Sequence, residues 1–373
     1  MKIIKYSNVY KLLFFFTSIS ICYVLVYNII NYDQIFGYDA EAHQAYINYI
    51  SMYLPRSLEL PTVDMTREFF SPPIPYLFPA VVGVLCRNLT TSSDFFNTCI
   101  PIYSFYTQIF QALILLFVIY IYIKVFKRLY VKSSTISLNI LLTVSLLTVN
   151  YKTFAMIRGE PYILLFNSLL LLHLLNIFEK NYELKIWDYL KFGVLLGLIA
   201  LSRQWGILLF PGLGFLILFI QSKKERDSYK KLVLTSFLIG LLTCGWFYGN
   251  LYITSGSITA FNDTPESFSF SNQNSDFYNP FNPESIKVFS EPIRPNFSNQ
   301  LLPILYSDLW GDYWGYFSFT SRSFEQGRNQ ESIGDYLGKV NILSLIPTFL
   351  MILGLSHYKK AFSNKNKSSL DLI

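Results

Sequence analysis

Long apolar runs separated by short polar segments form the main pattern along this chain. Several runs extend over 18 or more residues, and a helix of that length crosses about 30 Å of hydrocarbon. The pattern therefore predicts an all-α polytopic membrane protein with about eight transmembrane helices. Their expected ranges are Leu12 to about Ile30, Pro101 to Ile123, Ser134 to Asn150, Pro161 to Phe178, Trp187 to Ser202, Trp205 to Ile220, Leu232 to Ile253 and Val340 to Ser356.

The basic residues predict how these helices are oriented. Lys2, Lys5 and Lys11 precede the first run, and most of the 30 Lys and Arg residues lie in short segments on the same predicted side. Because cytoplasmic segments carry an excess of Lys and Arg, the amino terminus is expected in the cytoplasm. The apolar stretch Pro72 to Leu85 would invert every later basic segment if it crossed the membrane. It is therefore expected to be a juxtamembrane helix in the outer interface.

This topology leaves two large extracytoplasmic segments, residues 31–100 and about 254–339, on a compact helical body. The function is therefore expected on the outer side of the membrane. The second segment is rich in Asn, Ser, Pro and Phe, a composition that favours turns over long helices. The sequence shows no internal repeat, although inverted repeats are typical of many transporters.

The composition supports a membrane protein and argues against a nucleic-acid partner. Hydrophobic residues make up 52% of the chain and charged residues only 14%, against roughly 25% charged in an ordinary soluble domain. The formal net charge is +6, but the basic residues occur in short clusters between apolar runs and do not form one basic face. An orientation signal explains them better than nucleic-acid binding does.

Two of the four cysteines, Cys86 and Cys99, fall in the same predicted outer segment. An oxidising outer compartment would permit a disulfide between them, worth about 3 kcal/mol by loop-closure entropy. Cys22 and Cys244 lie within predicted spans, where buried free thiols are the simpler interpretation.

The first outer segment opens with three ionisable residues, Asp39, Glu41 and His43, directly after the first apolar run. Their spacing places them along one edge of a strand or around the first turns of a helix. Carboxylates are also favoured at helix N-termini, where they meet unpaired N–H groups and the helix dipole. This motif alone therefore fits either a catalytic group or a helix start.

A second motif follows in the same segment. After an amphipathic stretch that ends at Pro55, the chain reads Glu68-Phe69-Phe70-Ser71-Pro72-Pro73-Ile74-Pro75-Tyr76-Leu77-Phe78-Pro79-Ala80. An acidic residue after the first span, an interfacial helix and a Pro-Pro-apolar-aromatic helix together resemble the first outer loop of the GT-C membrane glycosyltransferases. The similar branch includes the aminoarabinose transferase of lipid A and the protein O-mannosyltransferases.

Three further strings fit the same resemblance, which covers about residues 10 to 255. They are the basic turn Lys124-Val-Phe-Lys127-Arg128, the string Arg158-Gly159-Glu160-Pro161, and the Gly-rich stretch from Gly193 to Pro211. The resemblance implies a GT-C-like catalytic module over residues 1–253, an extracytoplasmic loop over 254–339, and a last transmembrane helix with a cytoplasmic tail over 340–373.

The resemblance also implies the activity and the partners. GT-C enzymes transfer a sugar from a polyprenyl-phosphate carrier to an acceptor hydroxyl outside the cytoplasm. The expected partners are therefore a polyprenyl-phosphate-linked sugar donor, a glycan, lipid or protein acceptor, and membrane lipids. The expected location is the bacterial inner (plasma) membrane.

Roles for individual residues follow from matching them to that pattern. Asp39 matches the acidic position of the catalytic base, with Glu41 as the second choice. Many relatives carry Lys or Gln just before the Pro-Pro pair, where this chain has Ser71, so the donor phosphate is expected to bind arginines instead. The candidates are Arg158, Arg203 and Arg67, because guanidinium binds phosphate in a bidentate manner and keeps its charge near lipid.

A further set of residues is expected to contact the acceptor or the sugar. The segment from Tyr306 to Tyr316 is dense in aromatic and acidic residues, and aromatic faces stack on sugar rings while carboxylates accept hydrogen bonds from their hydroxyls. An aromatic belt at the membrane interface explains the same segment equally simply. The full set of candidates is His43, Glu160, Asp308, Trp310, Asp312 and Trp314.

The cofactor and the class of protein remain open at this point. The chain has only three His residues, so a metal site built on His43 has little support, although a divalent metal stays possible. One alternative function is a transporter or flippase of lipid-linked glycans, which would favour ionisable residues at the bilayer midplane. Another is a non-catalytic subunit that binds a glycan-assembly partner.

Overall fold

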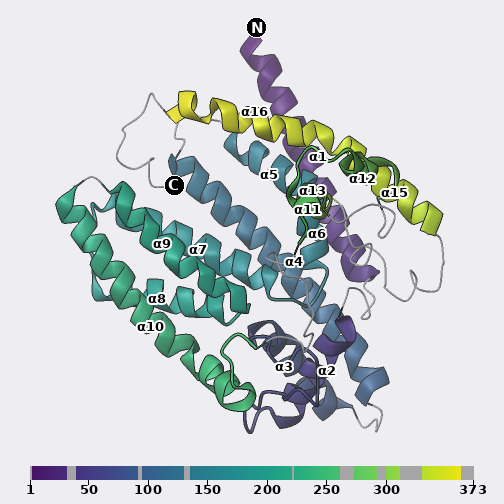
Figure 1. Cartoon of the computed structure of the whole chain (residues 1–373), viewed down its shortest axis with the longest axis vertical. Helices are drawn as coiled ribbons and strands as arrows, with labels where there is room; N and C mark the ends of the chain where they lie inside the picture. Colours follow the sequence, from purple (N-terminus) through teal and green to yellow (C-terminus); the bar gives the residue numbers. More distant parts are fainter. Residues whose placement is uncertain are drawn as a thin grey trace.

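The computed structural model describes residues 2–31, 39–90, 95–129, 135–220, 222–260, 273–292, 300–310 and 330–362. Every regular element in these ranges is helical, as the apolar periodicity predicts (Figure 1). Most of the long helices run side by side, and the short helices α2 (Ala40–Tyr53) and α3 (Ile74–Leu89) gather at one end of them.

Five helical segments in the described ranges are long and apolar enough to cross a membrane. They are Asn8–Ile30 in α1 (Lys2–Ile30), Thr98–Leu129 in α4 (Phe95–Leu129), Glu160–Glu179, which is α7, Lys223–Ser255, which is α10, and Gly334–Gly354 in α15 (Gln330–Leu343) and α16 (Leu345–Phe362). These five coincide with five of the eight predicted spans, so the membrane character of the chain is supported.

The other three predicted spans correspond to shorter or divided helices. The run Ser134 to Asn150 divides into α5 (Ile136–Leu146) and α6 (Thr148–Phe154), and α8 (Ile186–Ala200) has 15 residues. The run Trp205 to Ile220 divides into η1 (Gln204–Leu208), α9 (Leu209–Phe215) and η2 (Leu216–Phe219). Pro211, Gly212 and Gly214 lie within this last run, and both residue types disfavour one long regular helix.

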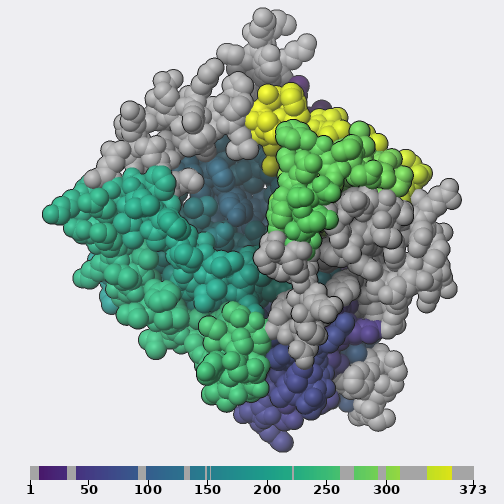
Figure 2. Space-filling model, in the orientation of Figure 1, coloured from purple at the N-terminus to yellow at the C-terminus, as the bar shows by residue number. Residues whose placement is uncertain are grey.

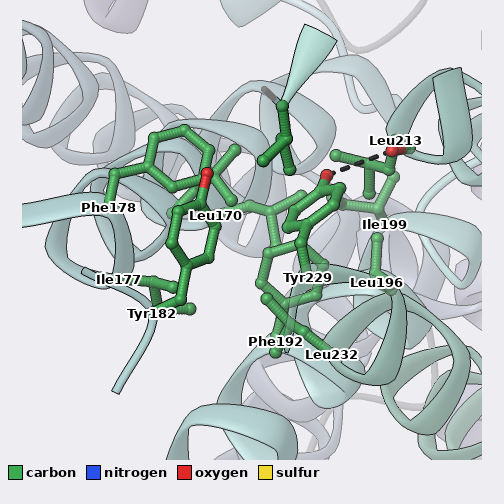
Figure 3. Close-up of a cluster of buried hydrophobic side chains, with 12 residues drawn as sticks. Leu170, Ile177, Phe178, Tyr182, Phe192, Leu196, Ile199, Leu213, Tyr229 and Leu232 are labelled. Atoms are coloured by element: carbon green, nitrogen blue, oxygen red, sulfur yellow. Dashed lines mark hydrogen bonds between the residues drawn. The ribbon is translucent and has the colours of Figure 1, made fainter. Parts of the chain in front are cut away.

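Helix α8 packs between α7 and α10 and approaches α10 very closely. A Cβ atom added at Gly193 would lie 2.5 Å from Ile239 Cβ, and one at Gly197 would lie 2.4 Å from Thr243 Cβ. Small residues that bring two helix backbones together in this way are typical of helix packing in membranes. Figure 3 shows the adjoining core, in which the Tyr229 hydroxyl donates a 3.0 Å hydrogen bond to the carbonyl of Leu213.

Residues 40–89 form a small helical unit on the long helices. Helix α2 packs on α3, and α3 packs on α4. The rings of Tyr46 and Tyr76 stack with centroids 4.0 Å apart at the centre of this contact. A disulfide between Cys86 and Cys99 joins the end of α3 to the start of α4, so the bridge that the sequence permits is present.

Between α10 and α15 the described residues form only short helices. They are α11 (Ser275–Tyr278), η4 (Pro283–Ile286), α12 (Lys287–Ser290) and α13 (Leu301–Trp310). Helix α13 packs against α6, α11 and α15. Figure 2 shows a hollow between this part and the α7–α10 part of the molecule, with α4 visible at its floor.

An apolar cavity of about 480 Å³ lies between α4, α5, α6 and α7. Leu115 and Val118 line it from α4, Ile140 from α5 and Leu164 from α7. Its volume falls within the range of small-molecule sites.

Candidate functional site

Charged side chains from four separate segments converge beside the amino end of α7. They come from the start of α2, the segment between α2 and α3, the residues around the start of α7, and the segment between α8 and η1. We call this set the ion cluster; it consists of Asp39, Arg67, Glu68, Arg158, Glu160 and Arg203.

Arg203 forms the centre of the ion cluster. Its Nε donates a 3.1 Å hydrogen bond to Oε1 of Glu160, and its Nη1 lies 3.7 Å from Oε2 of Glu68. The same Nη1 donates to the hydroxyl of Ser71 at 3.2 Å. The Arg203 side chain is 20% exposed, so this guanidinium is held by two carboxylates at the edge of the protein interior.

Glu68 is the most deeply buried carboxylate of the cluster, with a side chain 5% exposed. The Ser71 hydroxyl donates a short hydrogen bond to its Oε2, and Nδ1 of His43 lies 3.9 Å from the same oxygen. Burial raises the pKa of Glu68, while the Ser71 hydrogen bond and Arg203 act in the opposite direction. The ionised form of Glu68 therefore depends on these two partners.

His43 lies beneath the cluster as a buried neutral group. Its Nδ1 is hydrogen-bonded to the Tyr76 hydroxyl at 2.8 Å. Burial, together with the positive charges of Arg158, Arg203 and Arg67, keeps the pKa of His43 well below its usual value of 6.5. His43 therefore faces α3 as a hydrogen-bonding group.

Asp39 stands at the amino end of α2, where its backbone is in the left-handed region with φ of 66°. Its Oδ1 lies 2.8 Å from Nη2 of Arg67, whose side chain is 62% exposed. Burial raises the pKa of Asp39, and Arg67, Arg158 and Arg203 oppose that shift. The carboxylate thus lies where the cluster meets solvent.

Arg158 is partly buried in the turn that leads into α7. Burial lowers the pKa of Arg158, while Glu160, Glu68 and Asp39 attract its charge. The next residue, Gly159, lies so close to the end of α8 that a Cβ there would be 2.0 Å from the carbonyl oxygen of Ser202. This close approach brings Arg158 and Arg203 into one site.

Hydrogen bonds from side chains to backbone carbonyls hold the segments of the cluster in place. Gln204 donates to the carbonyl of Phe70 at 2.9 Å, and Tyr46 donates to that of Ser71 at 2.9 Å. On the other side, Gln108 and Gln111 of α4 donate to the carbonyls of Ala155 and Met156. The loops that carry the charges are therefore fixed by polar residues of the neighbouring helices.

The structure brings together six of the candidate residues from the sequence: Asp39, His43, Arg67, Arg158, Glu160 and Arg203. Glu41 lies in the first turn of α2 and is exposed. Trp310 is buried on α13 and Asp308 lies on the same helix, which Figure 1 shows apart from α2 and α3. Asp312 and Trp314 lie outside the described residues.

Glu68 is the residue of the candidate site that sequence reasoning missed. It begins the string Glu68 to Ala80 of the sequence, but no local feature distinguishes it from an ordinary exposed glutamate. Its pairing with Arg203, 135 positions later in the sequence, exists only in the folded protein, where Nη1 of Arg203 lies 3.7 Å from Oε2 of Glu68. Ser71 connects the two through its hydroxyl, which accepts a hydrogen bond from Arg203 and donates one to Glu68.

The described ranges contain no set of ligands for a metal ion. There, no group of three or more His, Cys, Asp and Glu side chains has the arrangement needed to hold a metal ion. The arginines of the cluster are instead suited to an anion, since planar guanidinium groups bind phosphate and carboxylate through paired hydrogen bonds.

Comparisons with known proteins identify no similar protein. No family model, no curated protein and no solved structure matches the chain. Its function therefore has to be inferred from the chemistry of the ion cluster.

Proposed function

We propose that this protein is a GT-C-like glycosyltransferase that moves a sugar from a polyprenyl-phosphate carrier to an acceptor on the extracytoplasmic side of the membrane. The observation that carries the proposal is the convergence of Asp39, Arg158 and Arg203 in one partly buried cluster at an end of the long helices. The chemistry needs a base for the acceptor and a cation for the phosphate, and the cluster contains both groups.

In the proposed reaction the acceptor hydroxyl oxygen bonds to the anomeric carbon of the donor sugar. The bond between that carbon and the phosphate oxygen breaks, and the polyprenyl phosphate leaves with the electron pair. Asp39 accepts the hydroxyl proton, and Arg158 and Arg203 stabilise the charge on the leaving phosphate. Arg67, the most exposed of the three arginines, is a further contact for the phosphate or for the arriving acceptor.

The remaining candidates are proposed to contact the sugar or the acceptor. Glu160 is suited to accept hydroxyl hydrogen bonds, because its side chain is 27% exposed beside Arg203. His43 is suited to shape the floor beneath the sugar, and Glu41 stays the second choice for the base. From the second outer segment the proposed contacts are Asp308, Trp310, Asp312 and Trp314.

We further propose that the shorter helices also cross the membrane, giving eight crossings with the cluster on the outer side. Helix α8 supports this view, because it packs along both α7 and α10 and Ser202, just after its end, meets Gly159 at the start of α7. Its 15 residues extend over about 22 Å. The Cys86–Cys99 disulfide supports an oxidising compartment on the side of α3, which in a bacterial inner membrane is the outer side.

The direct test compares Asp39→Asn with the parent in a transfer assay that uses purified protein and polyprenyl-phosphate sugars. Loss of the general base should lower the rate about 10²–10⁴-fold. Because burial raises the pKa of Asp39 and the carboxylate is the active form, the parent rate should fall as pH drops through that raised value.

Glu59→Gln is the matched control, since Glu59 is an exposed carboxylate of the same outer segment. Transfer by Asp39→Asn at the parent rate would exclude Asp39 as the base. Absence of transfer by the parent with every donor tested would instead favour a flippase, a transporter or a binding subunit.

A further inference from the structure

The ion cluster carries equal numbers of positive and negative side chains. Arg67, Arg158 and Arg203 face Asp39, Glu68 and Glu160, and His43 is the neutral group beneath them. A phosphate that binds Arg203 therefore does not enter a positive site. It enters a site in which carboxylates already neutralise the guanidinium groups, and like charges repel strongly where water is scarce.

We propose that Glu68 is the counter-ion of Arg203 that gives way to the donor phosphate, so that binding of one phosphate monoanion is coupled to uptake of one proton by Glu68. This inference rests on the proposed function, and it adds a positioning residue and a pH dependence to the same site. In the step, the Glu68 carboxylate becomes a neutral carboxylic acid, and Nη1 of Arg203 turns to a phosphate oxygen.

Glu68 is better suited to this role than the other two carboxylates. Its side chain is 5% exposed, compared with 14% for Asp39 and 27% for Glu160. Burial disfavours the charged form of a carboxylate, and this effect is largest for the least hydrated carboxylate. The raised pKa of Glu68 agrees with this order.

Ser71 can form a hydrogen bond with Glu68 in both protonation states. The Ser71 hydroxyl donates to the ionised carboxylate, and it can accept the proton of the neutral acid, because a hydroxyl both donates and accepts. Arg203 keeps its 3.1 Å hydrogen bond to Glu160 through Nε while Nη1 is released. Arg203 therefore stays anchored to Glu160 when its Nη1 turns to the phosphate.

The other groups that face Glu68 set the direction of the coupling. Arg203 and Arg158 favour its ionised form, whereas Asp39 on α2 favours the neutral one. His43 on α2 is neutral, and Tyr76 on α3 is uncharged at neutral pH. A bound phosphate adds a negative charge to this set and shields Arg203, so it raises the proton affinity of Glu68.

The test measures the affinity of the purified full-length protein for methyl farnesyl phosphate from pH 5.5 to 8.5. This phosphodiester keeps a single fixed charge over that range, so a pH dependence cannot come from the ligand. For the parent, the dissociation constant should rise with pH, by at most tenfold per unit. Glu68→Gln should bind with an affinity independent of pH, equal to or tighter than that of the parent at low pH, whereas Glu59→Gln should behave as the parent.

Calorimetry of the parent in two buffers of different ionisation enthalpy measures the proton directly, whether or not Glu68→Gln folds. Uptake approaching one proton per bound phosphodiester is expected between the pKa of Glu68 in the free protein and its higher pKa in the complex. Binding without proton uptake, or a Glu68→Gln variant that retains the parent's pH dependence, would overturn the inference and leave the proposed transfer intact. Absence of binding at every pH would overturn both the inference and the proposed donor site.

Discussion

Gly159 shows how one residue without a side chain permits the whole candidate site. It separates Arg158 from Glu160 in the sequence, and its Cα faces the carbonyl of Ser202 so closely that no Cβ fits. Arg203, the residue after Ser202, can therefore reach Glu160 and Glu68. A larger residue at position 159 would separate the two arginines from each other.

We expect Gly159→Ala to destabilise the protein by about 1–3 kcal/mol, because the added methyl group overpacks a site closed by backbone. It should also weaken phosphate binding by displacing Arg158 from Arg203. Thermal unfolding in detergent and the phosphodiester binding assay measure the two effects. Gly245→Ala on α10 is the control, since a Cβ there meets nothing within 4 Å. Equal stability of the two variants would contradict the close approach.

His43 provides a second prediction at the scale of one residue. Because its pKa in the folded protein is well below 6.5, the unfolded chain binds a proton at a higher pH than the native one. The stability that depends on neutral His43 is therefore fully present above about pH 6.5 and is lost as the pH falls below that value.

Thermal unfolding of the parent and of His43→Gln between pH 5 and 8 tests this assignment. The parent should lose stability below about pH 6.5 with a slope that His43→Gln lacks, although the variant starts from a lower stability. Parallel pH curves for the two proteins would show that His43 is not the buried neutral group described.

At the scale of elements, the small unit of α2 and α3 places half of the ion cluster against the long helices. The Cys86–Cys99 disulfide fixes the end of α3 to the start of α4. The Thr66 hydroxyl donates to the carbonyl of Ala42 and joins the intervening segment to α2. Asp39, His43 and Glu68 are thereby carried by one unit, whereas Arg158, Glu160 and Arg203 belong to the α7–α8 pair.

We expect replacement of Cys86 and Cys99 by Ser to lower the free energy of unfolding by about 3 kcal/mol, since the bridge closes a loop of 13 residues. Glu68 and Asp39 should then be held less firmly against Arg203, and phosphate binding should weaken. Thermal unfolding with and without reductant measures the first effect. A parent protein whose unfolding does not respond to reductant would argue against the bridge.

At the scale of the whole molecule, the proposed chemistry requires the α2–α3 unit to face the extracytoplasmic side. In this orientation the segment between α7 and α8 faces the cytoplasm. Exposed Glu59 and Glu183 mark the two sides. Each lies outside the helices, so a cysteine at either position reports the compartment without disturbing a span.

Single-cysteine variants test this orientation in intact cells, in a background where the free thiols of Cys22 and Cys244 are replaced. A membrane-impermeant maleimide should label Glu59→Cys in intact cells and Glu183→Cys only after permeabilisation. The reverse pattern would place the ion cluster in the cytoplasm and would exclude transfer from a carrier presented on the outer side.

Hydropathy and charge along the sequence determined much of this molecule. Five of the eight predicted spans are long apolar helices, the helix predicted over Pro72 to Leu85 appears as α3, and the bridge between Cys86 and Cys99 is present. These features follow from local properties, because a continuous apolar run needs only helical hydrogen bonding to be stable in a bilayer. The division of Trp205 to Ile220 into short helices follows less directly, since proline and glycine weaken a helix without fixing where it breaks.

The ion cluster, in contrast, depended on the tertiary structure. The sequence nominated Asp39, Arg158 and Arg203 separately, but only the packing of α8 against α7 and the close approach at Gly159 bring them to one place. The environment of Glu68 arises in the same way, because burial and a distant arginine change its proton affinity and local sequence does not. Hydrophobicity acts residue by residue and can be read along the chain, whereas electrostatic coupling depends on distances that exist only after folding.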